Sequence, residues 1–508
     1  LVNHAVEHAH QHGFAMLLMH FIVVCAMTCI PWLCSSAIRE PLLIGYASSM
    51  IKVFRDSPVQ PIGDAGIHIY SGRNEWEAFQ IVLRAQGAVV RNISIRVSDL
   101  HGPHGAMIPS EHIEICRVGY VYIRQPSHRI GHQGWYPDPL IPQSAPFTLP
   151  ANVGNQPLWF TVKVPKGIIA GDYRGFIELS WSADSNTSST VKRITRRIPL
   201  RLTVWDITLP DAYHTGSAFG LWYDEVRIAH GLKAGTSEEK AMREKYYWFL
   251  VERHLPPRNL PVNPASEGAE RFLNDPRVYN FALPFSRNRE EFARLMEYIK
   301  SKGWLQKGYL YVIDEPSPQD YPRCRETYQY IKSIEPQAKF LLTEPPTPEL
   351  YGYVDIWCPN LAAFDEQHAR ERQALGEQVW WYTCIGPKYP YPTYLIDDDG
   401  ISHRILQWMQ AVYNVQGNLY WSTTCWRRWN SKLQRREPND VWENPMAFPG
   451  GNGDGFLLYP GSKVGIDGPI SSIRLELIRD GTEDCEYLWL LRHEIDELAK
   501  RFDLTKHI

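Results

Sequence analysis

The spacing of apolar residues changes at Pro210, and this change restricts the possible folds more than any other feature of the sequence. From about Ile51 to Pro210 the chain consists of short runs rich in β-branched and aromatic residues, several of which alternate with polar residues. Such runs are typical of half-buried antiparallel strands. After Pro210, strand-like runs alternate with stretches that carry apolar residues at helical spacing, which is typical of parallel β-α units. The 508 residues therefore predict a multidomain protein that combines a β region with an α/β region.

The first region, residues 45–210, is predicted to be an antiparallel β-sandwich, because it shows no long helical period and its strand-like runs are separated by turn residues. The clearest strands are expected at Phe79–Leu83, Ile93–Val97, Gly119–Ile123, Leu158–Val164, Phe176–Trp181 and Ile198–Val204.

The second region, residues 211–445, is predicted to be a (β/α)8 TIM-like barrel, since it contains eight strand-like runs with helical stretches between several of them. The strands are expected at Ala218–Tyr223, Arg258–Val262, Val278–Leu283, Tyr309–Ile313, Phe340–Thr343, Asp355–Cys358, Val379–Cys384 and Asn418–Ser422. The helices are expected at Ser237–Glu252, Arg287–Lys302, Tyr321–Ile334, Glu366–Leu375 and Ser402–Tyr413.

Residues 446–508 are predicted to complete the catalytic domain. Gly450–Gly468 is a loop rich in Gly and Asp, and Ser471–Phe502 has the apolar spacing of a long helical segment. Gly481 interrupts this segment, so the sequence leaves one helix and two helices as alternatives.

The N-terminal residues 1–37 are predicted to be a signal peptide or a membrane anchor. Phe14–Cys34 carries no charged residue, and the small residues Ser35-Ser36-Ala37 that follow favour cleavage. We therefore expect an exported protein, secreted or tethered to the cell surface by this segment, with no other membrane contact. Export permits disulfides, but the sequence leaves open how the remaining cysteines pair. These are Cys116, Cys324, Cys358, Cys384, Cys425 and Cys485.

The ends of the predicted barrel strands are aromatic and acidic, and a barrel of this class places its active site at those ends. Asp314 and Glu315 directly follow an apolar strand and precede Pro316, so both side chains are expected at the rim as catalytic residues. No cluster at metal-ligand spacing is found, and we expect neither a metal nor a cofactor. With 18 Trp, 27 Tyr and a net charge of −3, a glycan partner is favoured and a nucleic acid is not. The candidate substrate-binding residues are Trp222, Tyr223, Glu344, Trp357, Trp381, Tyr382 and Trp421.

The adjacency of Asp314 and Glu315 restricts the mechanism. Neighbours on one strand cannot flank a glycosidic bond from opposite sides, as the carboxyls of ordinary retaining and inverting glycosidases do. They can lie along one side, where one protonates the leaving oxygen. The other holds the 2-acetamido group of the substrate, whose carbonyl oxygen attacks the anomeric carbon. This arrangement is substrate-assisted catalysis.

Several segments together resemble glycoside hydrolase family 123, whose known members are retaining exo-β-N-acetylgalactosaminidases. By this resemblance Asp314 orients and polarises the acetamido group, and Glu315 is the general acid and then the base for the water that attacks the oxazoline. Cys485 stands where the resemblance predicts an aromatic residue. The resemblance covers about residues 50–500. It is carried by Tyr311-Val-Ile-Asp-Glu-Pro316, Gly453-Asp-Gly-Phe-Leu-Leu-Tyr-Pro-Gly461, Ile473-Arg-Leu-Glu-Leu-Ile-Arg-Asp-Gly481, Glu483-Asp-Cys-Glu-Tyr-Leu-Trp-Leu-Leu491, Pro157-Leu-Trp-Phe-Thr-Val162 and Ala170-Gly-Asp-Tyr-Arg-Gly175.

Two other functions remain open from the residues alone. A conventional retaining glycosidase on non-acetamido sugars would pair Glu315 with a second carboxylate, but the seventh predicted strand ends without one, and Glu344 is a less usual partner. A catalytically silent carbohydrate-binding surface protein would keep the aromatic rim without needing the intact Asp314-Glu315 pair.

Overall fold

The computed structural model describes residues 41–183 and 192–502. By its contacts the chain divides into two compact units, Leu1–Pro41 and Leu42–Ile508, and every element described below belongs to the second. The hydrophobic cores extend from Leu42 to Ile478, so the second unit supplies its own cores. The predicted signal peptide or anchor lies outside the described residues. Among the helices that are described, none is long and apolar enough to span a bilayer.

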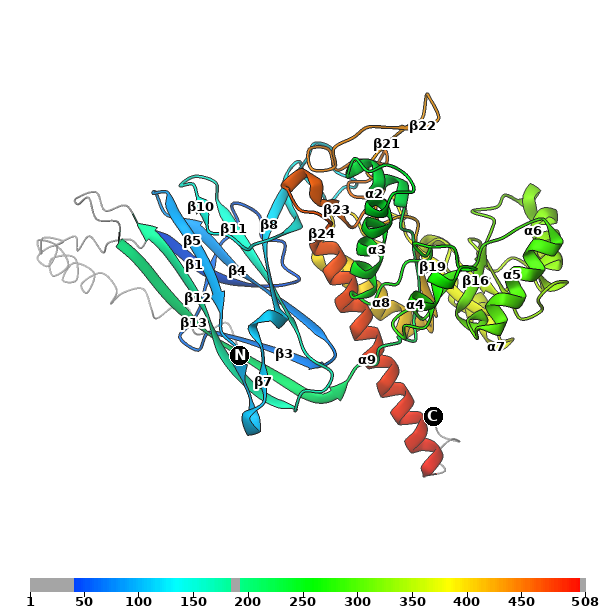
Figure 1. The fold of residues 1–508 in the computed structure, drawn as a ribbon, viewed down its shortest axis with the longest axis horizontal. Coiled ribbons are helices and arrows are strands. Elements are labelled where there is room, and N and C mark those ends of the chain that lie inside the picture. The colour runs from blue at the N-terminus through cyan, green and yellow to red at the C-terminus, as the bar shows by residue number, and fades with distance from the viewer. Residues whose placement is uncertain (1–40, 184–191, 503–508) are drawn as a thin grey trace, which may run out of the picture. The chain divides into compact units, whose positions relative to one another are not determined.

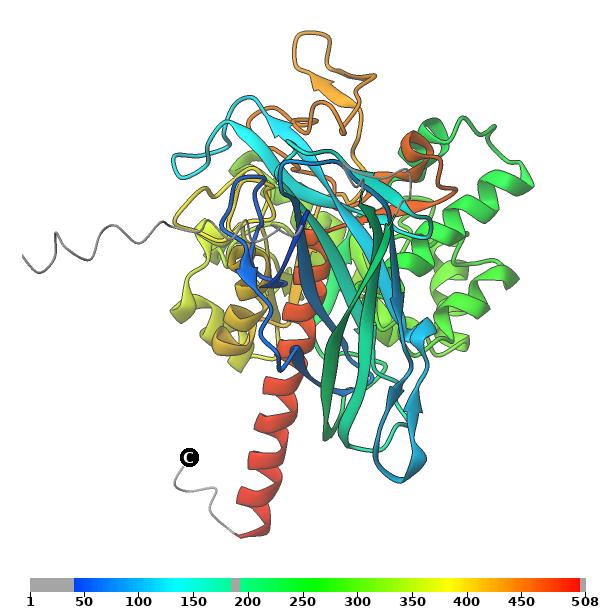
Figure 2. The ribbon, with the colours of Figure 1, turned by 90° about the vertical axis from the view of Figure 1, so that its left-hand side faces the viewer.

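Two β-sheets pack face to face in the N-terminal region, and the antiparallel strands that the sequence predicts there are confirmed (Figures 1 and 2). The first sheet contains, in spatial order, β2 (Gln60–Pro61), β1 (Leu42–Ser48), β4 (Trp76–Ala85), β11 (Asn155–Lys163), β8 (Ile113–Ile123), β9 (Gly134–Pro142), β24 (Pro469–Ser472) and β23 (Tyr459–Pro460). The second contains β10 (Phe147–Leu149), β5 (Val90–Val97), β12 (Gly171–Ala183), β13 (Lys192–Thr208) and β3 (Ile67–Arg73), with β6 (Leu100–His101) and β7 (Met107–Ile108) at its margin.

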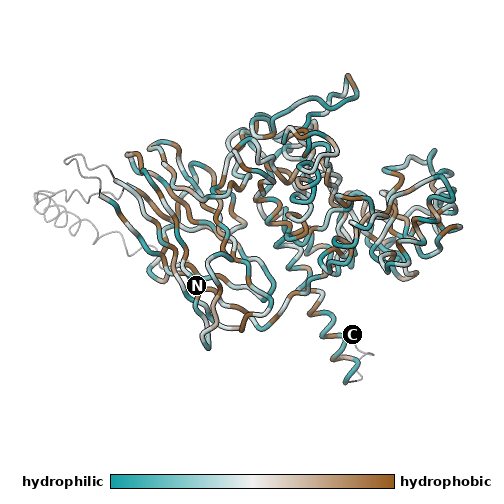
Figure 3. The backbone as a smooth tube through the Cα atoms, viewed as in Figure 1, coloured by the Kyte–Doolittle hydropathy of each residue, from teal (hydrophilic) through white to brown (hydrophobic). Residues whose placement is uncertain are grey.

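The core between these two sheets follows from the alternation of side chains along each strand. Ile81 and Phe160 of the first sheet and Ile177 and Trp181 of the second are almost completely buried in one hydrophobic cluster. Only β13 and β3 pair in parallel within the second sheet. Figure 3 shows hydrophobic and hydrophilic segments alternating along the backbone of the sandwich and of the α/β region.

The C-terminal part of the chain returns to the first sheet. β24 pairs with β9, placing Ser471 opposite Leu140 and Ser472 opposite Pro139. The segment that follows residue 445 therefore does not belong to the α/β region alone, because β23 and β24 join the first sheet of the sandwich.

Seven parallel strands form the sheet of the α/β region, and they nearly close into a ring. Their order is β14 (Gly216–Phe219), β20 (Gly417–Tyr420), β19 (Gln378–Tyr382), β18 (Ile356–Trp357), β17 (Lys339–Leu342), β16 (Gly308–Tyr311) and β15 (Phe281–Ala282). A hairpin of β21 (Arg428–Asn430) and β22 (Arg435–Glu437) follows β20 along the chain.

One of the eight predicted strands, Arg258–Val262, does not form, so the (β/α)8 prediction is correct only in part. Prolines at 256, 257 and 261 cannot donate the backbone hydrogen bonds of a strand. The segment still lies in the gap of the ring. The Arg258 backbone N–H donates to the Phe219 carbonyl at 2.9 Å, and its carbonyl accepts from Ala282 N–H at 2.6 Å.

The helices predicted from apolar spacing are confirmed. They are α3 (Ser237–Val251), α5 (Arg289–Ser301), α6 (Tyr321–Lys332), α7 (Glu366–Ala374) and α8 (Gly400–Tyr413), with the additional short helices α2 (Tyr223–Ala229) and α4 (Glu270–Leu273). The C-terminal segment forms one continuous helix, α9 (Ile473–Arg501), and Gly481 does not interrupt it. A Cβ atom at Gly481 would lie 2.6 Å from the Arg404 carbonyl of α8, so this glycine permits the close approach of the two helices.

Candidate active site

Asp314 and Glu315 lie just beyond β16, where the parallel strands end at their carboxyl edge. Both residues are exposed, whereas Ile313 before them and Pro316 after them are buried. The buried neighbours fix the backbone on both sides of the pair and leave the two carboxylates facing solvent. The structure thus places the predicted catalytic pair at the rim, as the sequence led us to expect.

The backbone of Glu315 departs from the strand conformation. Its φ is +42°, in the left-handed region that residues other than glycine rarely adopt. Such a conformation costs about 1–2 kcal/mol and accumulates at functional sites. Consecutive residues of a regular strand point to opposite faces, so this turn is what frees Glu315 from strict alternation with Asp314.

Two hydroxyl groups hold the Asp314 carboxylate. The Tyr311 hydroxyl donates to Asp314 Oδ1 at 2.5 Å, and the Thr343 hydroxyl donates to the same oxygen at 3.1 Å. Burial, followed by the nearby Asp314 carboxylate, raises the pKa of the Tyr311 phenol, so it remains a donor at neutral pH. No described residue donates to Asp314 Oδ2, which leaves that oxygen available to a ligand.

Glu315 is held by side chains from two further strands. Its backbone N–H donates to the Thr343 hydroxyl at 2.6 Å, and its Oε1 accepts a hydrogen bond from the Tyr382 hydroxyl at the end of β19. Burial raises the pKa of the Tyr382 phenol, and the hydrogen bond to Glu315 raises it further. Thr343 therefore connects both members of the pair, accepting from one backbone and donating to the other side chain.

An aromatic wall lies at the neighbouring ends of β14 and β20. The Trp222 and Trp421 rings meet edge to face with centroids 5.2 Å apart, and both are half-buried. The Arg436 guanidinium, from β22, lies over the Trp222 ring at 4.4 Å. Half-exposed indoles at a strand-end rim are suited to packing on the apolar face of a sugar ring.

The loop with the sequence Gly453-Asp-Gly455 supports this wall. Trp421 Nε1 donates to Asp454 Oδ1 at 3.1 Å, and burial raises the pKa of Asp454 to about 6. A Cβ atom at Gly455 would lie 2.2 Å from the Trp421 ring, and the φ of this residue is +79°, so only glycine fits. Arg474 of α9, fully buried, donates to the Gly453 carbonyl at 2.9 Å and forms an ion pair with Asp138.

Several predicted binding residues lie elsewhere. Trp357 and Trp381 are fully buried between the sheet and its helices, so neither can contact a substrate. Along β19 it is Trp380 and Tyr382 that face the interior of the ring. Tyr223 is 7% exposed, and its hydroxyl donates to the Asn259 carbonyl at 2.9 Å.

Glu344 does not share contacts with Asp314 and Glu315, the candidate catalytic pair. Its Oε1 accepts from the Tyr321 hydroxyl at 2.7 Å, at the start of α6. Burial raises the pKa of this carboxyl. None of the contacts found among the described residues joins Glu344 to Asp314 or Glu315.

Residues that contact the predicted site but were not among the candidates from the sequence include Thr343, Asp454, Arg436 and Tyr311. Tyr311 and Asp454 lie within segments that carry the family resemblance, and their position gave a usable signal. The others come from distant strands or loops, and only the folded chain brings them together.

Among the described residues, no group of three or more His, Cys, Asp or Glu side chains has a geometry that could hold a metal ion, and the six described cysteines are free.

Paired carboxylates at a strand end of a nearly closed parallel sheet, with aromatic residues at other strand ends of the same sheet, define a glycoside hydrolase type of site. The sequence matches the family models described as "Glycoside hydrolase 123, catalytic domain" over residues 287–491 and "Glycoside hydrolase 123 N-terminal domain" over residues 55–181. The chain belongs to glycoside hydrolase family 123.

Solved structures agree with this assignment at the level of fold. A family 123 glycoside hydrolase from Clostridium perfringens, studied for glycolipid glycan hydrolysis, superimposes with a TM-score of 0.69 and 16% identity over 91% of each chain. β-Glucuronidase 2 from Bacteroides uniformis gives a TM-score of 0.28 at 9% identity, covering 85% of this chain and 49% of its own. The CooA pilin subunit of Escherichia coli gives a TM-score of 0.19 at 10% identity, and the match covers 32% of this chain and 99% of the pilin. The last two similarities are too weak to bear on fold or function. Comparison with curated proteins finds no match.

Proposed function

We propose that this chain is an exo-acting retaining glycosidase that removes terminal β-linked N-acetylgalactosamine, or a related 2-acetamido sugar, by substrate-assisted catalysis. The observation that carries the proposal is the placement of Asp314 and Glu315 side by side, both exposed, with one oxygen of each already engaged by protein donors. We interpret the nearly closed ring as a (β/α)8-type barrel with its active site at the usual carboxyl edge.

Asp314 is assigned the role of binding and orienting the acetamido group of the substrate. Its Oδ1 is occupied by the Tyr311 and Thr343 hydroxyls, so Oδ2 is free to accept the N–H of the acetamido group. That hydrogen bond places negative charge beside the amide and makes its carbonyl oxygen a better nucleophile. The carbonyl oxygen attacks the anomeric carbon as the glycosidic bond breaks, and an oxazoline forms.

Glu315 is assigned the proton transfers. It donates a proton to the departing glycosidic oxygen, and its carboxylate then takes a proton from the water that opens the oxazoline. The sugar leaves with the configuration it had in the substrate, because two inversions occur at the anomeric carbon. Tyr382 fixes Oε1 of Glu315, which leaves Oε2 for these transfers.

Trp421 and Trp222 are assigned to the sugar ring, since their half-exposed indoles can pack on its apolar face. The glycolipid glycan acted on by the Clostridium perfringens relative supports a glycan of that kind as the substrate class. We place the activity outside the cytoplasm on the strength of the uncharged segment Phe14–Cys34.

The test is hydrolysis of aryl β-N-acetylgalactosaminide by the chain from Ile38 onward, beside the aryl β-galactoside and β-N-acetylglucosaminide. Activity confined to acetamido sugars, and lost in both Asp314→Asn and Glu315→Gln, is the expected result. Cleavage of the plain galactoside, or activity that survives in both variants, would refute the mechanism and favour a conventional glycosidase.

A further inference from the structure

The last turns of α9 carry an apolar stripe that no described residue covers. From Leu491 to Arg501 every residue except Ala499 is exposed, and both views show this end of the helix extending away from the other elements (Figures 1 and 2). Leu491, Ile495 and Leu498 are 58%, 44% and 47% exposed, and Phe502 just after the helix is 64% exposed. Large apolar side chains exposed together in this way mark an interaction surface.

The spacing of these residues is that of a coiled-coil seam. The apolar positions 488, 491, 495, 498 and 502 follow one another at intervals of three and four residues. This is the a/d repeat of a heptad, in which each side chain fits between side chains of a second helix. An ordinary surface helix that packs on its own protein has a wider apolar face than this.

The charges beside the seam specify the orientation of the second helix. Positions 494 and 501 both fall at g of the heptad and carry Glu and Arg, whereas the e positions carry Arg492 and Ala499. In a parallel pair Glu494 would face Ala499, and no ion pair would form. In an antiparallel pair the g positions of the two helices face each other. Glu494 of each helix then lies opposite Arg501 of the other, which gives two ion pairs. Within the described structure neither Glu494 nor Arg501 forms an ion pair of its own.

We propose that two copies of this chain associate through an antiparallel pairing of the ends of α9. The pattern is self-complementary, because Leu491 lies opposite Phe502 and Ile495 opposite Leu498 when the two helices are related by a two-fold axis. Such an interface closes on itself and yields a dimer.

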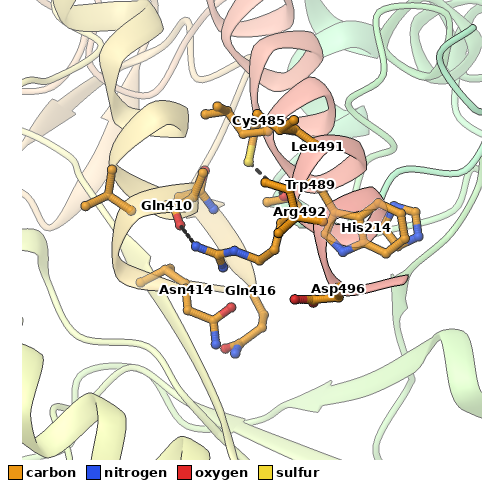
Figure 4. A pocket seen from close by; sticks show the side chains of 15 residues that line it. His214, Gln410, Asn414, Gln416, Cys485, Trp489, Leu491, Arg492 and Asp496 are labelled. Carbon is orange, nitrogen blue, oxygen red and sulfur yellow. Dashed lines mark hydrogen bonds between the residues drawn. The ribbon is translucent and has the colours of Figure 1, made fainter. Parts of the chain in front are cut away.

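A cavity next to the stripe extends the interface beyond the helix pair. It has a volume of about 530 Å³ and is lined by residues of the end of α8 and of α9, among them Val412 of α8 and Leu491 and Ile495 of α9. Figure 4 shows Gln410 of α8 and Leu491 of α9 at this cavity. Val412 is 65% exposed. Phe502 of the second copy lies opposite Leu491 and is positioned to fill the mouth of this cavity. Thr215 and Gln416, which also line the cavity, directly precede β14 and β20. The surface is therefore at the opposite strand ends from Asp314.

The experiment is sedimentation velocity over a range of concentrations with the chain from Ile38 onward, which contains every described hydrophobic core. We expect a reversible dimer whose Kd rises at least about tenfold in Glu494→Arg and in Arg501→Glu, since each creates two like-charge contacts. The double variant restores the ion pairs with reversed polarity and recovers dimerisation. Glu497→Arg is the matched control, because position 497 lies away from the seam and its variant should dimerise normally.

Leu498→Asp provides a second test that does not depend on charge pairing. Leu498 is exposed in the single chain, so at concentrations well below the dimer Kd its replacement should leave the thermal unfolding midpoint unchanged, and at higher concentrations it should abolish the dimer. A monomer at all concentrations, or single charge reversals that dimerise like the control, would overturn the proposal. Binding of a monomer to phospholipid vesicles, lost in Leu498→Asp, would also overturn it and assign the stripe to a lipid surface.

Discussion

At the scale of single residues, Thr343 has the largest expected influence outside the carboxylates themselves. Its hydroxyl accepts from the Glu315 backbone and donates to the Asp314 side chain, so one atom fixes both groups. Thr343→Val keeps the shape and removes the hydroxyl. Because small displacements of reacting groups can cost about a hundredfold in rate, we expect kcat/KM to fall by that order. Thr343→Ser keeps the hydroxyl and should retain most of the activity, whereas equal losses in both variants would show that the methyl group matters instead.

Also at this scale, the structure places Asp314 and Glu315 at the exposed strand end that the sequence indicated, whereas it buries Trp357 and Trp381, two of the tryptophans predicted to bind substrate. A carboxylate after an apolar strand is a strong signal, because burying it unpaired is costly. The run Val379-Trp-Trp-Tyr382 has no polar residue to show which side chains face inward, and a shift by one residue exchanges the two faces. Thr343 and Arg436 could not be predicted, since their partners at the site are distant in sequence.

At the scale of elements, the strands of the sandwich and the longer helices were predictable because their apolar residues repeat regularly. The structure around Arg258 was not predictable, because the prolines there cannot donate the hydrogen bonds of a strand and only isolated backbone hydrogen bonds form. At Gly481 the sequence left one helix and two helices open. The structure has a single helix, and Gly481 lies where α9 comes close to the backbone of α8.

Because of this contact, we expect Gly481→Ala to destabilise the protein, whereas glycine-to-alanine changes in helices usually stabilise. In an unobstructed helix the change stabilises by about 1 kcal/mol. Here the added Cβ atom would lie 2.6 Å from the Arg404 carbonyl, so we expect destabilisation by about 1–3 kcal/mol in urea unfolding. Gly167→Ala is a suitable control, since no atom lies within 4 Å of its added Cβ. A more stable Gly481→Ala variant would contradict the packing described.

At the scale of the whole molecule, buried charges connect the sandwich to α9. Glu75, between β3 and β4, accepts from the Tyr487 hydroxyl of α9 at 2.5 Å. Burial, followed by the charge of Glu483, raises the pKa of Glu75 to about 7 from its ordinary value of 4.5. The folded protein therefore holds this proton more tightly than the unfolded chain does.

The sign of the resulting pH dependence follows directly. Because the pKa of Glu75 is higher in the folded protein than in the unfolded chain, protonation of Glu75 favours the folded state. This contribution to the free energy of unfolding is complete below about pH 4.5 and is lost as the pH rises to about 7. At about 1.4 kcal/mol per pKa unit, the loss across this window is about 3 kcal/mol. Glu75→Gln should remove this part of the pH dependence and be more stable than the parent chain at pH 7.5. Parallel stability profiles for the two proteins would exclude a role for Glu75.

The central claim is that the acetamido group of the substrate is the nucleophile, and a series of fluorinated substrates tests it most directly. Aryl glycosides with acetamido, fluoroacetamido, difluoroacetamido and trifluoroacetamido groups differ in the nucleophilicity of the carbonyl oxygen, which each fluorine lowers. We predict that kcat/KM falls steeply at each step along the series. A kcat/KM that stays constant across the four substrates would contradict the account, because a carboxylate of the enzyme would then have to be the nucleophile.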